Sequence, residues 1–84
     1  MRIFVTAKDI REGAKSACEA CPVARAIKRR VTCRVVVGMG FISFGLKSSV
    51  LTPTQVANFI DRFDGGKKVK PFSFLLDVPK QYVR

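Results

Sequence analysis

The sequence predicts an α+β fold in a single domain spanning residues 1–84. Short alternating or β-branched segments are separated by stretches with helix caps and helical periodicity. The length leaves room for only one core, and a hydrophobic content of 48% excludes a disordered chain. The expected order is β-α-(α)-β-β-α-β, with helices on one face of a small antiparallel sheet. The ferredoxin-like split βαβ is the nearest known architecture.

The first strand is predicted at residues 2–7, RIFVTA, where Ile3 and Val5 lie on one face. Thr6-Ala7-Lys8-Asp9, which begins within this segment, resembles a capping box, with Asp9 where Glu or Gln is usual. A short helix should therefore begin there and end at Gly13.

A second helix is predicted after the loop GAKSACEA. Pro22 suits its first turn, because the N–H that proline lacks has no helical partner there. Val23, Ile27 and Val31 recur every four residues and should form its buried side.

A β-hairpin is expected next. Residues 32–38, TCRVVVG, are rich in β-branched side chains, and residues 41–47, FISFGLK, form the returning strand. The three residues Gly38, Met39 and Gly40 fit a short hairpin loop. The SSVLT segment that follows is assigned to neither a helix nor a strand.

The last helix carries the clearest pattern. TPTQ predicts a capping box with Thr52 as the N-cap residue. An apolar stripe follows at helical spacing, and DGG ends the helix; the stripe comprises Val56, Phe59, Ile60 and Phe63. Residues 71–78, PFSFLLDV, predict a final strand, and the tail PKQYVR is expected to be exposed.

The charge balance favours polyanionic partners. Sixteen Lys and Arg side chains against six acids give a net charge of +10, so nucleic acid is the first candidate and acidic protein surfaces or anionic membranes are the next. No apolar run approaches the roughly 20 residues that a membrane span needs. The N-terminal residues also lack the features of a signal peptide, so a cytoplasmic location is expected.

Two basic clusters are candidate nucleic-acid-binding sites. The first places five cations within ten residues, at Arg25, Lys28, Arg29, Arg30 and Arg34, and the second comprises Lys67, Lys68 and Lys70. Like charges three and four residues apart weaken a helix slightly, which suggests a use in phosphate neutralisation. The alternative for the first cluster is a solvated helix face with arginines near the negative end of the helix dipole.

The cysteines favour a structural interpretation. Cys18 and Cys21 have C-x-x-C spacing, but three Cys and no His cannot supply the four ligands of a structural zinc site. Redox chemistry gains support only from the position of Cys21 at a helix start. We expect Cys21 and Cys33 to be small buried hydrophobes and Cys18 to be a loop residue, with no metal or cofactor.

An enzyme is not expected either. Histidine is absent, which removes the usual general base and its nucleophile pairs. The seven Phe residues could stack on single-stranded nucleic acid, but most are needed for the core, and Phe4 is the best candidate for an exposed ring.

Two segments carry a resemblance. CEACPVARAIKRR followed by VVVG, and QVANFIDRFDGGKKVKPFSFLLDVP, resemble small proteins encoded by phages and prophages, which share a Cys-Pro-Val-Ala helix and a FI-x-x-FD-x-G…PF-x-F tail. The resemblance implies a phage protein acting in a bacterial cytoplasm and implies no site residues.

These observations together predict a non-enzymatic phage accessory protein that binds DNA or RNA, mostly through phosphate contacts. The alternative is a protein that inhibits or modulates a host complex, such as RNA polymerase or a defence nuclease. Its basic surface would then cover an acidic or nucleic-acid-binding surface of that complex.

Overall fold

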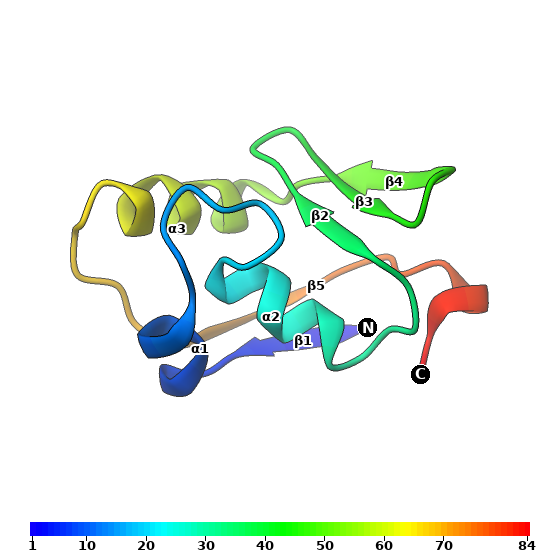
Figure 1. Ribbon diagram of the computed structural model, residues 1–84, viewed down its shortest axis with the longest axis horizontal. Coiled ribbons are helices and arrows are strands. Elements are labelled where there is room, and N and C mark those ends of the chain that lie inside the picture. The colour runs from blue at the N-terminus through cyan, green and yellow to red at the C-terminus, as the bar shows by residue number, and fades with distance from the viewer.

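The computed structural model describes all residues from Met1 to Arg84 and confirms the α+β class. The order of elements is also close to the expected one, with one additional strand (Figure 1). The helices are α1 (Ala7–Glu12), α2 (Pro22–Lys28) and α3 (Thr54–Asp64). The strands are β1 (Arg2–Val5), β2 (Val35–Val37), β3 (Phe41–Phe44), β4 (Ser48–Leu51) and β5 (Phe72–Leu75), and a 3₁₀ turn follows at Lys80–Tyr82.

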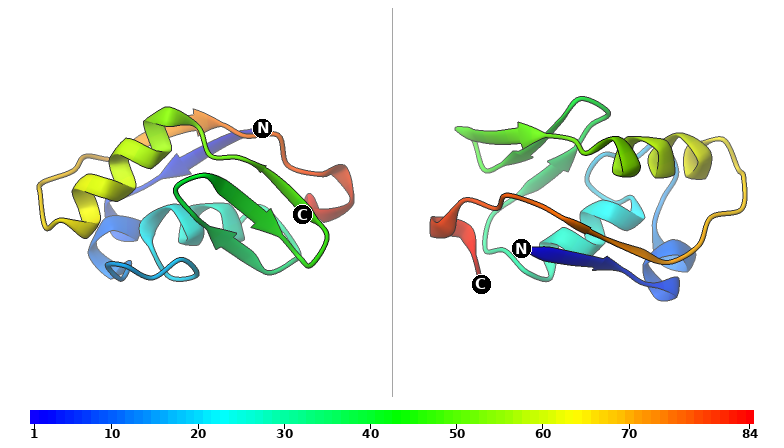
Figure 2. Two further views of the ribbon diagram at one scale, coloured as in Figure 1. Left: turned by 90° about the horizontal axis from the view of Figure 1, so that it is seen from above. Right: turned by 180° about the vertical axis from the view of Figure 1, so that it is seen from behind.

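The strands form two sheets instead of the single sheet of a ferredoxin-like split βαβ. β1 pairs antiparallel with β5, and β2, β3 and β4 form a separate antiparallel meander. β4 occupies the segment to which the sequence analysis assigned no element. From behind, Figure 2 shows β1 and β5 as a two-stranded ribbon with α2 on its far side.

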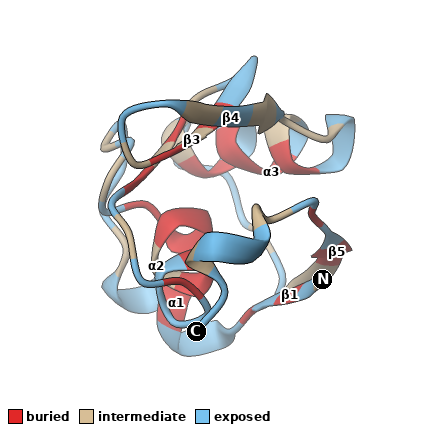
Figure 3. Ribbon diagram, turned by 90° about the vertical axis from the view of Figure 1, so that its right-hand side faces the viewer, coloured by how far each residue is buried: buried red, intermediate tan, exposed pale blue.

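The burial of α2 explains the division into two sheets. Pro22, Val23, Ala24, Ala26 and Ile27 are all buried, so the helix is apolar on more than the one side that its four-residue repeat indicates. It contacts β1, β2 and α1, and each sheet covers part of its surface. Figure 3 shows the resulting core, with buried residues on α2 and on the side of α3 that faces it.

In α3 the predicted apolar stripe is confirmed, but the predicted N-cap is wrong. Val56, Phe59, Ile60 and Phe63 are all buried. The N-cap residue is Pro53, and no side chain caps the helix. The Thr52 hydroxyl instead donates to the carbonyl oxygen of Gly38 at 2.7 Å, so it ties the entrance of α3 to the β2–β3 turn.

α1 begins at the predicted capping box, in which Thr6 and Asp9 accept from each other's backbone N–H. Thr6 therefore lies outside β1, which ends at Val5. The helix ends at Gly13, where an added Cβ would lie 2.6 Å from the Pro22 ring and 2.7 Å from the Asp9 carbonyl. The end of α1 therefore lies directly against the start of α2.

The C-terminal tail is mostly exposed, as expected, but it is also anchored to the rest of the fold. Tyr82 is half-buried against the core, and Val83 forms an isolated antiparallel bridge with Val31. The backbone N–H of Thr32 donates to the Tyr82 carbonyl at 2.9 Å. The tail therefore closes over the segment that leaves α2. None of the helices is long and apolar enough to cross a membrane.

Candidate nucleic-acid interface

A buried carboxylate organises the first basic cluster. Asp9 is the only buried charged residue, and its two oxygens accept from the guanidinium of Arg29 at 2.6 and 2.7 Å. Its Oδ2 also accepts from the Thr6 backbone N–H at 2.9 Å. Burial raises the pKa of Asp9, but the hydrogen bonds from Arg29 and Thr6 outweigh it and lower the pKa from 3.8 to about 2.

Arg25 and Arg29 are held in place by this carboxylate. Arg25 Nε lies 3.5 Å from Asp9 Oδ1 without a hydrogen-bond acceptor, and its NH2 group donates to Glu12 at 3.3 Å. Arg29 makes a further bond to the Phe4 carbonyl at 3.1 Å. Both arginines are therefore fixed in position, with side chains that remain 32% and 47% exposed.

These two arginines line a depression of about 570 Å³, which we call the basic pocket. Its lining residues are Thr6, Lys8, Arg25, Lys28 and Arg29. Four of the five are cations, and none is acidic or hydrophobic. An open pocket with this lining suits an anion such as a phosphate group.

Lys8 is the residue that the sequence analysis missed. It belongs to neither sequence cluster, yet α1 brings it to the same pocket as Arg25 and Lys28. One signal was present: Lys8 lies in the first turn of a helix, where the dipole disfavours a positive charge.

Arg30 and Arg34 do not line the basic pocket. Arg34 donates to both carboxylate oxygens of Glu19, at 2.5 and 2.8 Å, and these hydrogen bonds lower the pKa of Glu19. Arg30 donates to the Arg2 carbonyl at 3.2 Å. Lys28, in contrast, lines the pocket while its ammonium group donates to the Glu19 carbonyl.

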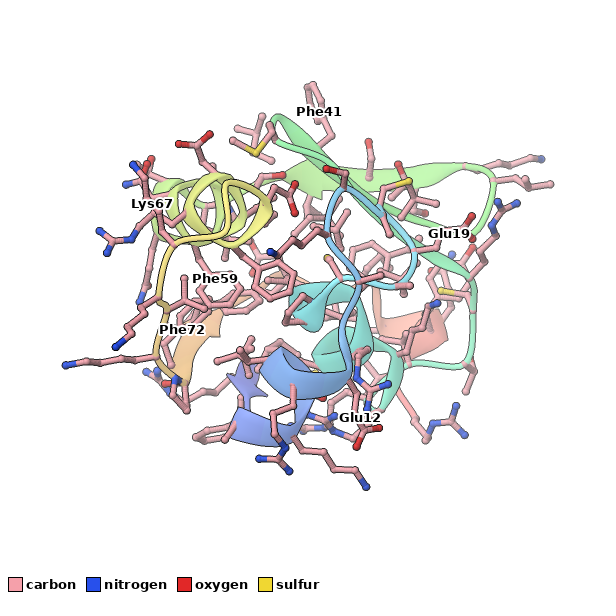
Figure 4. All side chains as sticks on the ribbon, turned by 60° about the vertical axis from the view of Figure 1, so that its left-hand side comes forward. Glu12, Glu19, Phe41, Phe59, Lys67 and Phe72 are labelled. Carbon is pink, nitrogen blue, oxygen red and sulfur yellow. The ribbon has the colours of Figure 1, made fainter.

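The second cluster lies in the loop between α3 and β5, which we call the lysine loop (residues 66–70). Lys68 and Lys70 line a groove together with the rings of Phe59 and Phe72, whose centroids are 4.7 Å apart. Arg62 adds a third cation to this groove. Figure 4 shows Phe59 and Phe72 close together on the same side as Lys67.

An aromatic depression joins the basic pocket to the groove beside the lysine loop. Phe4 and Pro71 line it, and it shares Thr6 with the basic pocket and Phe72 with the groove. The loop between α3 and β5 comes down beside α1, as Figures 1 and 2 both show. The fold therefore brings together two basic clusters that lie far apart in the sequence.

The cysteines lie outside this surface. Cys18 is exposed, Cys21 is buried, Cys33 is half-buried, and all three are free thiols. Cys21 is the N-cap residue of α2, and its sulfur accepts from the Ala24 N–H at 3.4 Å. Burial raises the pKa of Cys21, which opposes the thiolate that redox chemistry needs. No group of three His, Cys, Asp or Glu side chains could hold a metal ion.

Comparisons of the chain with protein-family models, with curated proteins and with solved structures find no match.

Proposed function

We propose that this protein is a non-enzymatic nucleic-acid-binding protein that contacts mainly phosphate groups. The observation that carries the proposal is the basic pocket, in which four cations surround an opening free of acidic and apolar side chains. The aromatic depression continues this surface to Lys68 and Lys70. Such a surface can neutralise several successive phosphates of one strand.

The distribution of ion pairs supports this assignment. Arg34 is paired with Glu19, Arg29 with Asp9, and Arg25 with both Asp9 and Glu12. Lys8 and Lys28 make no ion pair, although the charge of Lys28 helps to lower the pKa of the nearby Glu19. Lysines contact phosphates as point charges and carry no base-specific geometry, so weak sequence specificity is expected.

The proposal extends to a phage accessory protein in the cytoplasm of a bacterial host. This part rests on the resemblance of the Cys-Pro-Val-Ala helix and the FI-x-x-FD-x-G…PF-x-F tail to phage and prophage proteins.

The test replaces Lys8 and Lys28 together by Gln and measures affinity for a labelled oligonucleotide by fluorescence anisotropy. The control is Lys47→Gln with Lys80→Gln, two exposed lysines outside the pocket and the lysine loop. We expect the first pair to weaken binding at least about tenfold at low salt, because each lysine contacts a phosphate, and the control to change it little. Equal losses in both pairs would contradict a defined site.

Arg29 is unsuitable for such a test. Its guanidinium holds the buried Asp9, so a charge reversal there would set two carboxylates against each other and destabilise the fold. Replacing Lys8 and Lys28 leaves that ion pair intact.

The alternative function, binding to a host protein complex, gives a different result. The basic surface would then face an acidic protein surface, and the purified chain would bind no nucleic acid even at low salt. In a pull-down from infected cells, one host protein would be recovered after nuclease treatment.

A further inference from the structure

We propose that the ligand is a single strand, DNA or RNA, with one base stacked on Phe4 while the basic pocket and the lysine loop hold the flanking phosphates. The inference rests on the proposed function and makes it specific. It commits to an unpaired strand in place of a duplex.

The position of Phe4 is the first reason. The alternation of β1 buries Ile3 and Val5 and leaves Phe4 on the outer face, where it is 57% exposed. The core therefore does not need this ring. The Phe4 carbonyl accepts from Arg29, so the backbone that carries the ring is fixed beside the basic pocket.

The second reason is that cationic and aromatic side chains line neighbouring depressions of one surface. The aromatic depression shares Thr6 with the basic pocket, and it shares Pro71 and Phe72 with the groove that holds Arg62, Lys68 and Lys70. Single-strand-binding surfaces combine an aromatic platform for bases with cations that follow the backbone. A duplex keeps its bases stacked on each other, so it can offer one to Phe4 only at the cost of unpairing.

The size of the molecule sets the length of the probe. Its longest dimension is 35 Å, which corresponds to about ten stacked nucleotides at roughly 3.4 Å each. A ten-nucleotide strand is therefore long enough to cover the whole surface. It is also short enough to limit binding by two protein molecules.

The experiment compares ten-nucleotide single-stranded DNA and RNA with the corresponding DNA duplex by fluorescence anisotropy. The wild-type protein should bind at least one single strand more tightly than the duplex. Phe4→Ala should weaken single-strand binding by about 5- to 150-fold, because one base loses its stacking platform, and should leave duplex binding nearly unchanged.

Phe41→Ala is the matched control. Phe41 has the same ring and a similar exposure of 59%, but it lies on β3, in the other sheet. Figure 4 shows it projecting far from Phe72 and the lysine loop. Its removal should leave affinity unchanged. Circular dichroism should show that both variants fold, since neither ring is buried.

Tryptophan substitution gives a direct readout of stacking. The chain contains no Trp, so Phe4→Trp introduces a single Trp, whose fluorescence can be excited apart from that of Tyr82. Its emission should be quenched when the strand binds, whereas the emission of Phe41→Trp should not. Equal affinity for strand and duplex, or no effect of Phe4→Ala on single-strand binding, would refute the inference and leave the proposed function standing. No binding of either form at low salt would refute both.

Discussion

At the scale of single residues, Asp9 links stability to the binding surface. Its carboxylate accepts from the Thr6 backbone N–H in the capping box of α1 and fixes Arg29 and Arg25 at the edge of the basic pocket. The bidentate contact with Arg29 is the strongest geometry available to such a pair. Loss of this single carboxylate should therefore disturb both the fold and the site.

The pKa of Asp9 predicts how stability depends on pH. Because folding lowers it from 3.8 to about 2, the stabilisation is complete above pH 3.8 and is lost as the pH falls through 2. The shift corresponds to about 2 kcal/mol. Urea unfolding between pH 6 and pH 2 should show this loss. Asp9→Asn should be less stable at pH 6, and its stability should change less over the same range.

The three thiols should differ in reactivity. Cys18 is exposed, whereas Cys21 is buried and its pKa is raised by burial. We expect iodoacetamide to label Cys18 first, Cys33 more slowly and Cys21 last. Tandem mass spectrometry of the digested protein at successive times identifies which cysteine is labelled. Fast labelling of Cys21 in the folded protein would contradict its role as a buried helix cap.

At the scale of elements, α3 depends on its apolar stripe. Phe59 is 8% exposed and lies against Phe63 and Phe72, with ring centroids 6.1 and 4.7 Å away. Phe59→Ala should lower the free energy of unfolding by about 3–5 kcal/mol in urea titrations. Asn58→Ala, on the exposed side, should stay within about 0.5 kcal/mol. Similar losses for both would mean that the buried face is assigned wrongly.

Local signals predicted most of the elements, because caps and periodicity act over a few residues. Thr6 and Asp9 form the expected capping box, and the stripe of α3 is buried as its spacing requires. Thr52 shows where such signals fail. Its Thr-x-x-Gln pattern predicts a capping box, but the Thr52 hydroxyl donates instead to the Gly38 carbonyl, which lies 14 residues away in the sequence. A pattern of four consecutive residues gives no information about a hydrogen-bond partner so far away in the sequence.

At the scale of the whole molecule, long-range contacts decided what the sequence could not predict. The four-residue repeat of α2 indicated one buried side, but small residues such as Ala24 and Ala26 bury the helix further and allow a sheet on each side. The candidate site was likewise predicted only where its residues are close together in the sequence. Clusters could be predicted from charges close in sequence, whereas Lys8 joins Arg25 and Lys28 only through the packing of α1 on α2.

The salt dependence of binding tests the central claim most directly. The measurement is the affinity for a ten-nucleotide single strand between 50 and 200 mM salt, by fluorescence anisotropy. With roughly five phosphate contacts, the plot of log affinity against log salt should have a slope of about −3.5. Replacing Lys8 and Lys28 by Gln removes two of these contacts and should flatten it to about −2. A wild-type chain that fails to bind at 50 mM salt, or a slope that the double substitution leaves unchanged, would contradict the account.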